Sequence, residues 1–466
     1  MKVAFSRIDI TPNEYIGKAM AGYTRKDPCL GKLDDIHAYG VLIENNAKDN
    51  EYNCLLLISI DTLKLPISIV KYIKKELVKK FRLLTQRSII IHATHTHASF
   101  DLTGEFFWPG GLIAVMKGIM FGANRNDRYI VWLKKRLLKM VEDLFTNLKQ
   151  CKLSWKKEKF NPDIVINRRN PKRKVLPDLG VISFKSLDNN ELIGFIINYS
   201  CHPTTLSYKN NKLSADYPGR IIFKIDNDTK NKVSAIYFNG PSGDLNPITT
   251  CGTDFKEIEK DKTLVYNQLG TYDHTEKIGY RIAEEVIKLV NSISEDDYFN
   301  ELEFEVYGTQ FLIPMKDHKY YSKIWFKNKL YWIIKKHFLM RIAKIPMKSA
   351  NFPIFSMERK GFKMYCKTLI QFVKIKMIKK NNSKDLGIMT IPGELFEDIG
   401  KNLIKRSPMG ELNTFIFQNA QDWIAYLFPL EVYTQEGGYE PVPSFSPLCG
   451  YYVEKKVIKL MKEIKQ

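Results

Sequence analysis

The chain has 466 residues, of which 44% are apolar and 26% charged, and this composition excludes an intrinsically disordered protein. Lysine and arginine (72) exceed the acidic residues (51), giving a net charge of +21 that allows a nucleic-acid or anionic-membrane partner. In chain order, strands are predicted over 39–45 and 53–63, a helix over 66–81 and a strand over 87–97. This alternation is typical of a sheet covered by helices.

The rest of the chain continues the alternation of strands and helices. The predicted segments are a helix over 129–147, strands over 179–184 and 192–199, a strand entering a Gly/Pro-rich loop over 234–247, an amphipathic helix over 272–293, a strand, turn and helix over 383–404, and a strand and loop over 413–426. We therefore predict an α/β fold of large mixed sheets covered by helices, forming a single catalytic domain over 1–466.

One segment, residues 316–380, holds 18 basic and two acidic residues and is rich in Tyr, Trp and Phe. Basic aromatic helices bind anionic interfaces, so a lid or membrane-facing rim at the site entrance is one interpretation. An ordinary surface subdomain with biased composition is the other, and both stay open. Nucleic acid is the less favoured partner.

The seven cysteines are widely spaced and include no CxxC pair, which indicates no disulfide framework. The first residues lack the apolar core of a signal peptide, and no run of 18 apolar residues predicts a membrane-spanning helix. We therefore expect a cytoplasmic protein, with peripheral membrane contact as an open alternative.

Polar side chains recur where apolar strands end. They are Asp61, His95 with His97, His202, Asp244 and Glu394. Because ligands of open α/β sheets bind outside the carboxyl ends of the strands, we expect these side chains to converge and to place a metal site there.

Three of the eight histidines stand in "HATHTH". Residues two apart in a strand point to the same face, so His95 and His97 should share a face while His92 points away and is structural. A bare HxH pair is more often structural than metal-binding, so it needs support from elsewhere in the chain.

That support comes from later segments. His202 follows a strand and precedes a proline, Glu394 lies in a Pro-Gly turn, and Tyr426 lies in an aromatic loop. Two histidines, a glutamate and a further oxygen donor meet the needs of a catalytic zinc, which takes about three protein ligands and an open position. No HExxH helix, Walker loop or GxSxG elbow offers a competing chemistry.

Seven segments, in order and spanning almost the whole chain, resemble the catalytic domain of the neutral/alkaline (non-lysosomal) ceramidases: "DITP…MAGY", "ATHTHAS", "INRRNP", "CHPTTLS…SADYPG", "GPSGDLNP", "IPGE" and "AYLFPLEVYTQEGGYE". The resemblance implies a zinc amidohydrolase that cleaves an N-acyl bond. It implies Zn²⁺ ligation by His95, His202, Glu394 and Tyr426. It also implies that His97 and Arg168 are catalytic, and we infer that His97 handles protons and Arg168 stabilises the oxyanion.

The sequence departs from that family at three points. Asn246 stands in "GDLNP" where the ceramidases have a serine with an assigned catalytic role, which favours a zinc-hydroxide route. We also expect no C-terminal immunoglobulin-like domain and no secretion signal. Asp61, Asp244 and Asn246 are kept as candidates that support a metal ligand or bind substrate.

The expected function is zinc-dependent hydrolysis of an N-acyl substrate, most simply a ceramide-like lipid. One alternative is a deacetylase or amidase acting on an N-acyl sugar or another polar amide. An alternative of another class is a non-catalytic protein that binds membranes or nucleic acid. A deep apolar pocket lined by residues 316–380 would favour the lipid, and a shallow polar cleft would favour the polar amide.

Overall fold

The computed structural model describes residues 1–23, 25, 27–45, 52–104, 106, 126–250, 270–315, 352–361, 363–378, 384–436, 438–441 and 443–464. Its larger sheet has the strand order β11-β9-β8-β6-β1-β3-β4-β5. These strands are β1 (Lys2–Asp9), β3 (His37–Glu44), β4 (Cys54–Ile60), β5 (Ile89–Ala93), β6 (Lys149–Lys159), β8 (Asp178–Ser186), β9 (Leu192–Tyr199) and β11 (Ser234–Asn239).

The smaller sheet has the order β13-β15-β16-β18, with β14 beside β15. Its strands are β13 (Leu302–Pro314), β14 (Met357–Lys360), β15 (Lys363–Met377), β16 (Lys384–Thr390) and β18 (Thr414–Phe417). The main helices are α1 (Ile67–Lys80), α3 (Asp127–Thr146), α4 (Asp216–Thr229), α6 (Tyr272–Asn291), α9 (Glu397–Lys405) and α10 (Cys449–Ile464). The predicted α/β fold with mixed sheets covered by helices is confirmed.

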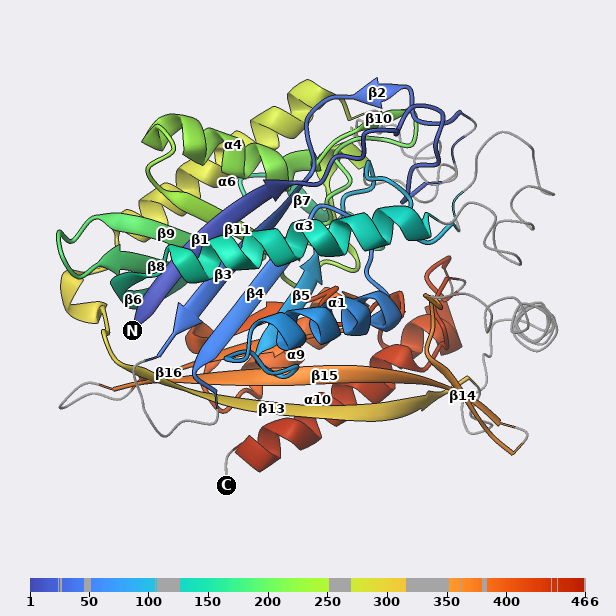
Figure 1. Cartoon of the computed structure of the whole chain (residues 1–466). Coiled ribbons are helices and arrows are strands. Elements are labelled where there is room, and N and C mark those ends of the chain that lie inside the picture. The colour runs from blue at the N-terminus through green and yellow to red at the C-terminus, as the bar shows by residue number, and fades with distance from the viewer. Residues whose placement is uncertain are drawn as a thin grey trace.

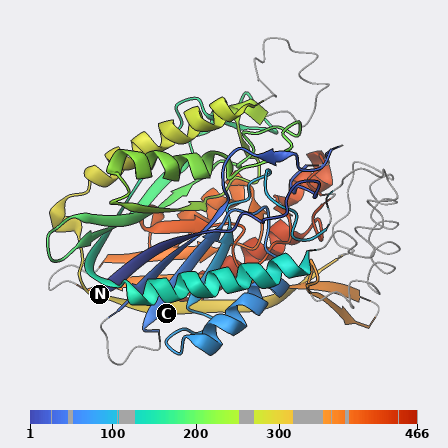
Figure 2. The same cartoon turned by 45° about the horizontal axis from the view of Figure 1, so that its top comes forward.

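The elements form four layers, with the two sheets in the middle (Figure 1). Helices α1 and α3 cover the β1–β3–β4 part of the larger sheet, and α4 and α6 cover its β8 and β11 part (Figure 2). Helices α9 and α10 cover the outer side of the smaller sheet. Such layering buries one face of every helix and both faces of each sheet.

Strand β4 shows how the sequence dictates these layers. Side chains alternate along a strand, so Leu55 and Leu57 join the core that the two sheets share, while Leu56 and Ile58 pack under α1 and α3. All seven residues of β4 are buried, which explains why its apolar run is unbroken.

Three pairs of parallel neighbours determine where polar side chains meet: β4 with β5, β9 with β11, and β16 with β18. The loops that leave their carboxyl ends carry the polar residues that the sequence singles out. The candidate site therefore lies at the carboxyl ends of these strands, as predicted.

The basic segment 316–380 is described only in part. Residues 316–351 lie outside the described residues, so the predicted lid or membrane-facing rim there stays a prediction. The later part contains β14 and β15, and β15 pairs with β13 on one side and β16 on the other. Residues 363–377 are therefore a central strand of the smaller sheet rather than part of an insertion.

Six of the seven cysteines lie in the described residues, and all six are buried. Among the described helices, none is both long enough and apolar enough to cross a membrane.

Candidate metal centre

The histidine motif lies in a turn rather than in a strand. The strand predicted over 87–97 ends at Ala93, because the backbone reverses at His95, where φ is +68°. The second half of that prediction is wrong, and side-chain alternation does not apply beyond Ala93. The turn still places the rings of His95 and His97 side by side, with centroids 5.0 Å apart.

His92 belongs to β5 and is held away from these rings. Its ring nitrogens lie 2.9 Å from Ser59 Oγ and 2.9 Å from Asn239 Oδ1. Burial lowers the pKa of His92 to about 3, so the ring stays neutral. These contacts make it a structural residue that joins β4, β5 and the end of β11.

Backbone carbonyls fix the orientation of two further rings. His95 Nδ1 lies 2.6 Å from the carbonyl oxygen of Leu63, and His202 Nδ1 lies 3.1 Å from that of Ser242. A carbonyl can only accept a hydrogen bond, so each Nδ1 carries the hydrogen and each Nε2 keeps its lone pair. Burial, with the neighbouring His95, lowers the pKa of His202 to about 3.

The Nε2 atoms converge with one carboxylate oxygen. His97 Nε2 lies 3.4 Å from His95 Nε2 and 3.1 Å from His202 Nε2. Glu394 Oε2 lies 3.3 Å from His95 Nε2 and 3.7 Å from His202 Nε2. Within the described part of the chain, this buried Oε2 has no hydrogen-bond donor. Three imidazoles and a carboxylate that converge in this way form a buried group that can hold a metal ion.

A transition metal fits this arrangement. Two donors bound to one tetrahedral zinc at ~2.0–2.1 Å lie about 3.3 Å from each other. The four separations in the cluster run from 3.1 to 3.7 Å. The three imidazoles form a group with the spacing of metal ligands, and imidazole with carboxylate is a donor set that suits zinc.

Tyr426 lies beside Glu394. The short strands β17 (Glu394–Leu395) and β19 (Tyr426–Leu427) pair in parallel, with Glu394 opposite Tyr426. The hydroxyl of Tyr426 lies 3.0 Å from that of Tyr439. Burial, and then the charge of Glu394, raises the pKa of Tyr426, so the phenol stays protonated. Its role as a metal ligand stays a prediction.

Gln418 and Gly243 join the halves of the centre that come from the two sheets. Gln418 Oε1 accepts hydrogen bonds from the amides of Ser242 (3.1 Å) and Leu395 (2.9 Å). The amide of Gly243 donates to the carbonyl of Leu395 at 2.7 Å. A Cβ at Gly243 would lie 2.5 Å from the carbonyl oxygen of Glu394, so "GPSGDLNP" requires glycine at this position.

Arg168 lies at the rim of the cluster, between aromatic rings. It follows β7 (Val165–Asn167), which pairs with β12 (Leu245–Pro247). Its guanidinium carbon lies 5.2 Å from the ring centroid of Tyr426 and 5.3 Å from that of Tyr439. This cation is therefore held in an aromatic environment beside the candidate metal ligands.

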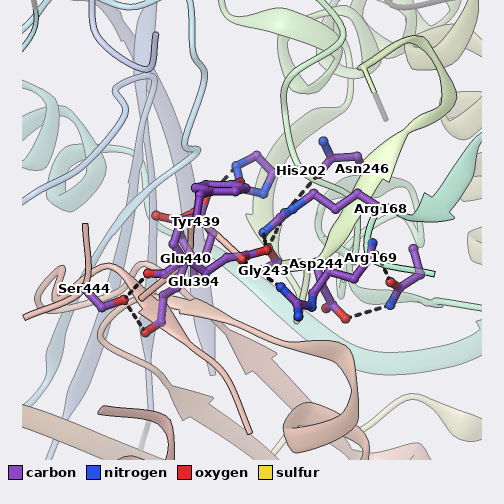
Figure 3. A network of polar contacts seen from close by, with 12 residues as sticks. Arg168, Arg169, His202, Gly243, Asp244, Asn246, Glu394, Tyr439, Glu440 and Ser444 are labelled. Carbon is purple, nitrogen blue, oxygen red and sulfur yellow. Dashed lines mark hydrogen bonds and ion pairs between the residues drawn. The ribbon is translucent and has the colours of Figure 1, made fainter. Parts of the chain in front are cut away.

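Hydrogen bonds anchor the same guanidinium (Figure 3). Arg168 Nη2 donates to Glu440 Oε1 at 3.0 Å, and Nη1 donates to the carbonyl of Gly243 and to Asn246 Oδ1, the latter at 3.3 Å. The Arg168 and Glu440 side chains are each 1% exposed, and Arg169 Nη1 donates to the other Glu440 oxygen at 2.9 Å. Arg168 is thus a buried and paired charge, although it stands in a basic run of the sequence whose charges would ordinarily be solvated.

Asp244 organises the backbone around Arg168. Its Oδ1 accepts a hydrogen bond from the amide of Glu397 at 2.7 Å, and its Oδ2 accepts one from Asn167 Nδ2 at 2.7 Å. Its carbonyl accepts the amide of Arg168 at 2.9 Å. Burial raises the pKa of Asp244 to about 6. Asp244 therefore holds together β7 and the first turn of α9.

Asp61 lies at the end of β4 but binds neither a histidine ring nor the next helix. Its Oδ1 accepts from Thr94 Oγ1 at 3.1 Å, and its Oδ2 accepts from the amide of His37 at 2.9 Å. The first amide of α1, at Ile67, donates instead to Asp422 Oδ1 at 2.8 Å. The printed contacts of Asp61 therefore join it to the backbone of β3 and to Thr94, and its role in supporting a metal ligand or binding substrate stays a prediction.

Asp61→Asn is expected to keep metal and activity while making the folded state less sensitive to pH. Burial raises the pKa of Asp61 from its ordinary 3.8 to about 7, so the folded state binds this proton more tightly than the unfolded state. Protonation of Asp61 therefore stabilises the folded state. This contribution to the free energy of unfolding is complete below the pKa of Asp61 in the unfolded chain and is lost as pH rises towards 7, at about 1.4 kcal/mol per pH unit. Urea unfolding of both proteins between pH 4 and 8 measures this difference. Loss of metal from the variant would contradict the placement of Asp61 away from the metal ligands.

A pocket of about 780 Å³ opens beside Arg168. Its walls combine charged groups of both signs with amides and rings: Asn167, Arg168, Arg169, Asn170, Arg173, Asp244, Phe396, Asp398, Pro429, Val432, Gly438, Tyr439 and Glu440. Described residues of the segment 316–380 do not line it. This pocket is polar and offers many hydrogen-bond donors and acceptors.

Sequence patterns single out neither Trp423 nor Glu440, although both contact candidate site residues. Trp423 Nε1 donates to Glu394 Oε1 at 3.1 Å, and Glu440 pairs with Arg168 and Arg169. Two consecutive arginines in a basic run give no signal of burial or of an acidic partner. A single tryptophan in a loop gives no such signal, because it reads as a core aromatic.

Solved structures of two ceramidases have the same fold as this chain. The crystal structure of neutral ceramidase from Pseudomonas aeruginosa matches with a TM-score of 0.70 at 14% identity, over 100% of this chain and 74% of that chain. A ceramidase complexed with C2 matches with a TM-score of 0.70 at 14% identity, over 100% and 75% of the two chains. No protein-family model and no curated protein matches the chain. The resemblance to the neutral ceramidases is thus confirmed for the fold.

Proposed function

We propose that this chain is a metal-dependent amide hydrolase that cleaves the N-acyl bond of a ceramide-like lipid. The observation that carries the proposal is the convergence of three imidazole Nε2 atoms with the buried Glu394 Oε2. The shared fold of the two ceramidase structures supports the substrate class. Water is added across the amide, and the products are a carboxylic acid and an amine.

By the resemblance, His95, His202, Glu394 and Tyr426 would hold Zn²⁺, and His97, whose Nε2 lies 3.1 Å from that of His202, would be a catalytic neighbour of these ligands. Bound zinc lowers the pKa of a water towards ~7 and polarises an amide carbonyl. The carbonyls of Leu63 and Ser242 keep the two histidine rings in the ligating tautomer.

His97 and Arg168 would carry the chemistry of the chain itself. Burial and the neighbouring His95 lower the pKa of His97, so its ring is neutral and can accept a proton from the attacking water. The same ring can then return that proton to the departing amine nitrogen. The Arg168 guanidinium would stabilise the negative charge that develops on the amide oxygen, a role worth roughly 3–4 kcal/mol for one donor.

The polar pocket beside Arg168 favours a second candidate function. An N-acyl sugar or another polar amide would find hydrogen-bond partners in the amide and charged side chains that line it. This reading keeps the same metal and the same bond cleavage and changes only the group attached to the nitrogen.

Metal analysis joined to a substrate panel tests the proposal. The purified protein is expected to contain zinc and to release fatty acid from ceramide, with activity lost on chelation and recovered on zinc addition. Hydrolysis of N-acyl sugars without ceramide would select the second candidate. A metal-free protein that cleaves neither substrate would contradict both.

Asn246→Ser is expected to leave the chelator-sensitive activity within about fivefold of wild type. Asn246 accepts a 3.3 Å hydrogen bond from Arg168, which keeps its bonds to Gly243 and Glu440 when that amide is gone, and one neutral acceptor is worth about 1 kcal/mol. The kcat of wild type and variant on the same N-acyl substrate measures this. A large gain in rate, insensitive to chelator, would instead point to a serine-type site.

A further inference from the structure

One oxygen of the candidate ligand Glu394 is held by an indole, and the face of that indole is covered by a cation. Trp423 Nε1 donates to Glu394 Oε1 at 3.1 Å. The ammonium nitrogen of Lys64 lies 4.1 Å from the ring centroid of Trp423. All three side chains are buried. A buried ammonium over an indole is an interaction that desolvation strengthens.

We propose that Lys64 and Trp423 are positioning residues that present Glu394 Oε2 to the metal. This inference rests on the proposed metal-dependent function. A carboxylate held at Oε1 by one N–H is restrained from rotating, and its other oxygen then stays 3.3 Å from His95 Nε2. The cation withdraws electron density from the indole, which makes its N–H a stronger donor to the carboxylate.

The two loops that carry this pair also hold the histidine side of the centre. Lys64 follows Leu63, whose carbonyl fixes the ring of His95. Asp422 Oδ1 accepts hydrogen bonds from the amides of Trp423 (2.7 Å) and Ile67 (2.8 Å), and so binds the second loop to the first. A shift of Lys64 or Trp423 is therefore transmitted to both a nitrogen and an oxygen ligand.

The zinc affinity of the apoprotein tests the pair, measured by competition with a chromophoric chelator. Trp423→Phe keeps an aromatic side chain in the core but removes the N–H, and it is expected to weaken zinc binding about 10- to 100-fold. Lys64→Met is expected to weaken it roughly two- to fivefold, and Lys64→Arg should restore it, because arginine keeps the cation.

Trp155→Phe is the matched control. Its indole is also buried and donates to a side-chain oxygen, Asn413 Oδ1, at 2.9 Å, but this oxygen belongs to a residue outside the candidate ligands. This variant should bind zinc like wild type. The quench or shift of tryptophan fluorescence on zinc addition should persist in Trp155→Phe and fall in Trp423→Phe.

The outcomes separate the inference from the function on which it rests. Wild-type protein that binds no zinc would overturn the proposed function together with the pair. Wild-type protein that binds zinc, with Lys64→Met and Trp423→Phe binding equally well, would overturn the pair alone. If Trp423→Phe does not fold, Lys64→Met against Lys64→Arg decides, since both replace the lysine with a side chain of similar length.

Discussion

Replacing His202 with alanine is expected to remove bound metal and to lower amide hydrolysis by about three orders of magnitude, because a metal supplies several kcal/mol of transition-state stabilisation. His202 Nε2 lies within 3.1 Å of His97 Nε2 and 3.7 Å of Glu394 Oε2, so its loss removes one of the converging donors. Metal content per protein, followed by kcat on the preferred N-acyl substrate, measures the effect. His95→Ala should behave alike.

His274→Gln provides the control for removing an imidazole. His274 Nδ1 accepts a hydrogen bond from the amide of Thr271 in the capping box of α6, a contact that glutamine can also make. This variant should keep metal and activity. Normal metal content in both His95→Ala and His202→Ala would show that the convergence of Nε2 atoms serves another purpose.

Arg168→Met is expected to lower both stability and catalysis. The free energy of unfolding should fall by about 3 kcal/mol, the low end of the cost of breaking a buried ion pair. The low end applies because Glu440 still has Arg169, at 2.9 Å. The rate should fall by roughly 10²–10³-fold if the guanidinium stabilises the oxyanion. Urea unfolding and steady-state kinetics measure the two effects separately.

The double variant Arg168→Met with Glu440→Met separates these roles. The second change removes the buried Glu440 carboxylate, which Arg168→Met leaves with Arg169 alone, so part of the lost stability should return. The rate should not return, because the donor to the amide oxygen is still absent. Recovery of both stability and rate would show that Arg168 only holds the loops in place.

Local sequence patterns predicted the helices and strands that are buried on one face and the strands that are buried on both faces. The periodic helix over 272–293 and the unbroken apolar run of β4 are examples. Strand β15 was read as part of a basic segment, although buried and partly exposed residues alternate along much of it. Charge summed over the whole of 316–380 obscured this alternation, since lysines on the partly exposed positions contribute charge without breaking a strand.

Sequence patterns predicted where in the fold the site lies better than they predicted how its side chains are arranged. His202 and Glu394 each follow an apolar strand, which allowed both to be placed at strand ends, although their strands belong to different sheets. The left-handed turn at His95 depends on packing that no local pattern encodes. The same is true of contacts across long separations, such as Arg168 with Glu440 and Trp423 with Glu394.

The candidate ligands come from both sheets, since the histidines follow strands of the larger sheet and Glu394 follows β16 of the smaller one. A cation bound among them would act as a cross-link between the two halves of the core, and the unfolded chain has no equivalent binding place. Mass action then adds about 4 kcal/mol to the folding free energy at a free metal concentration 1,000 times the Kd. Scarcity of the metal would therefore reduce the amount of folded protein as well as its rate of turnover.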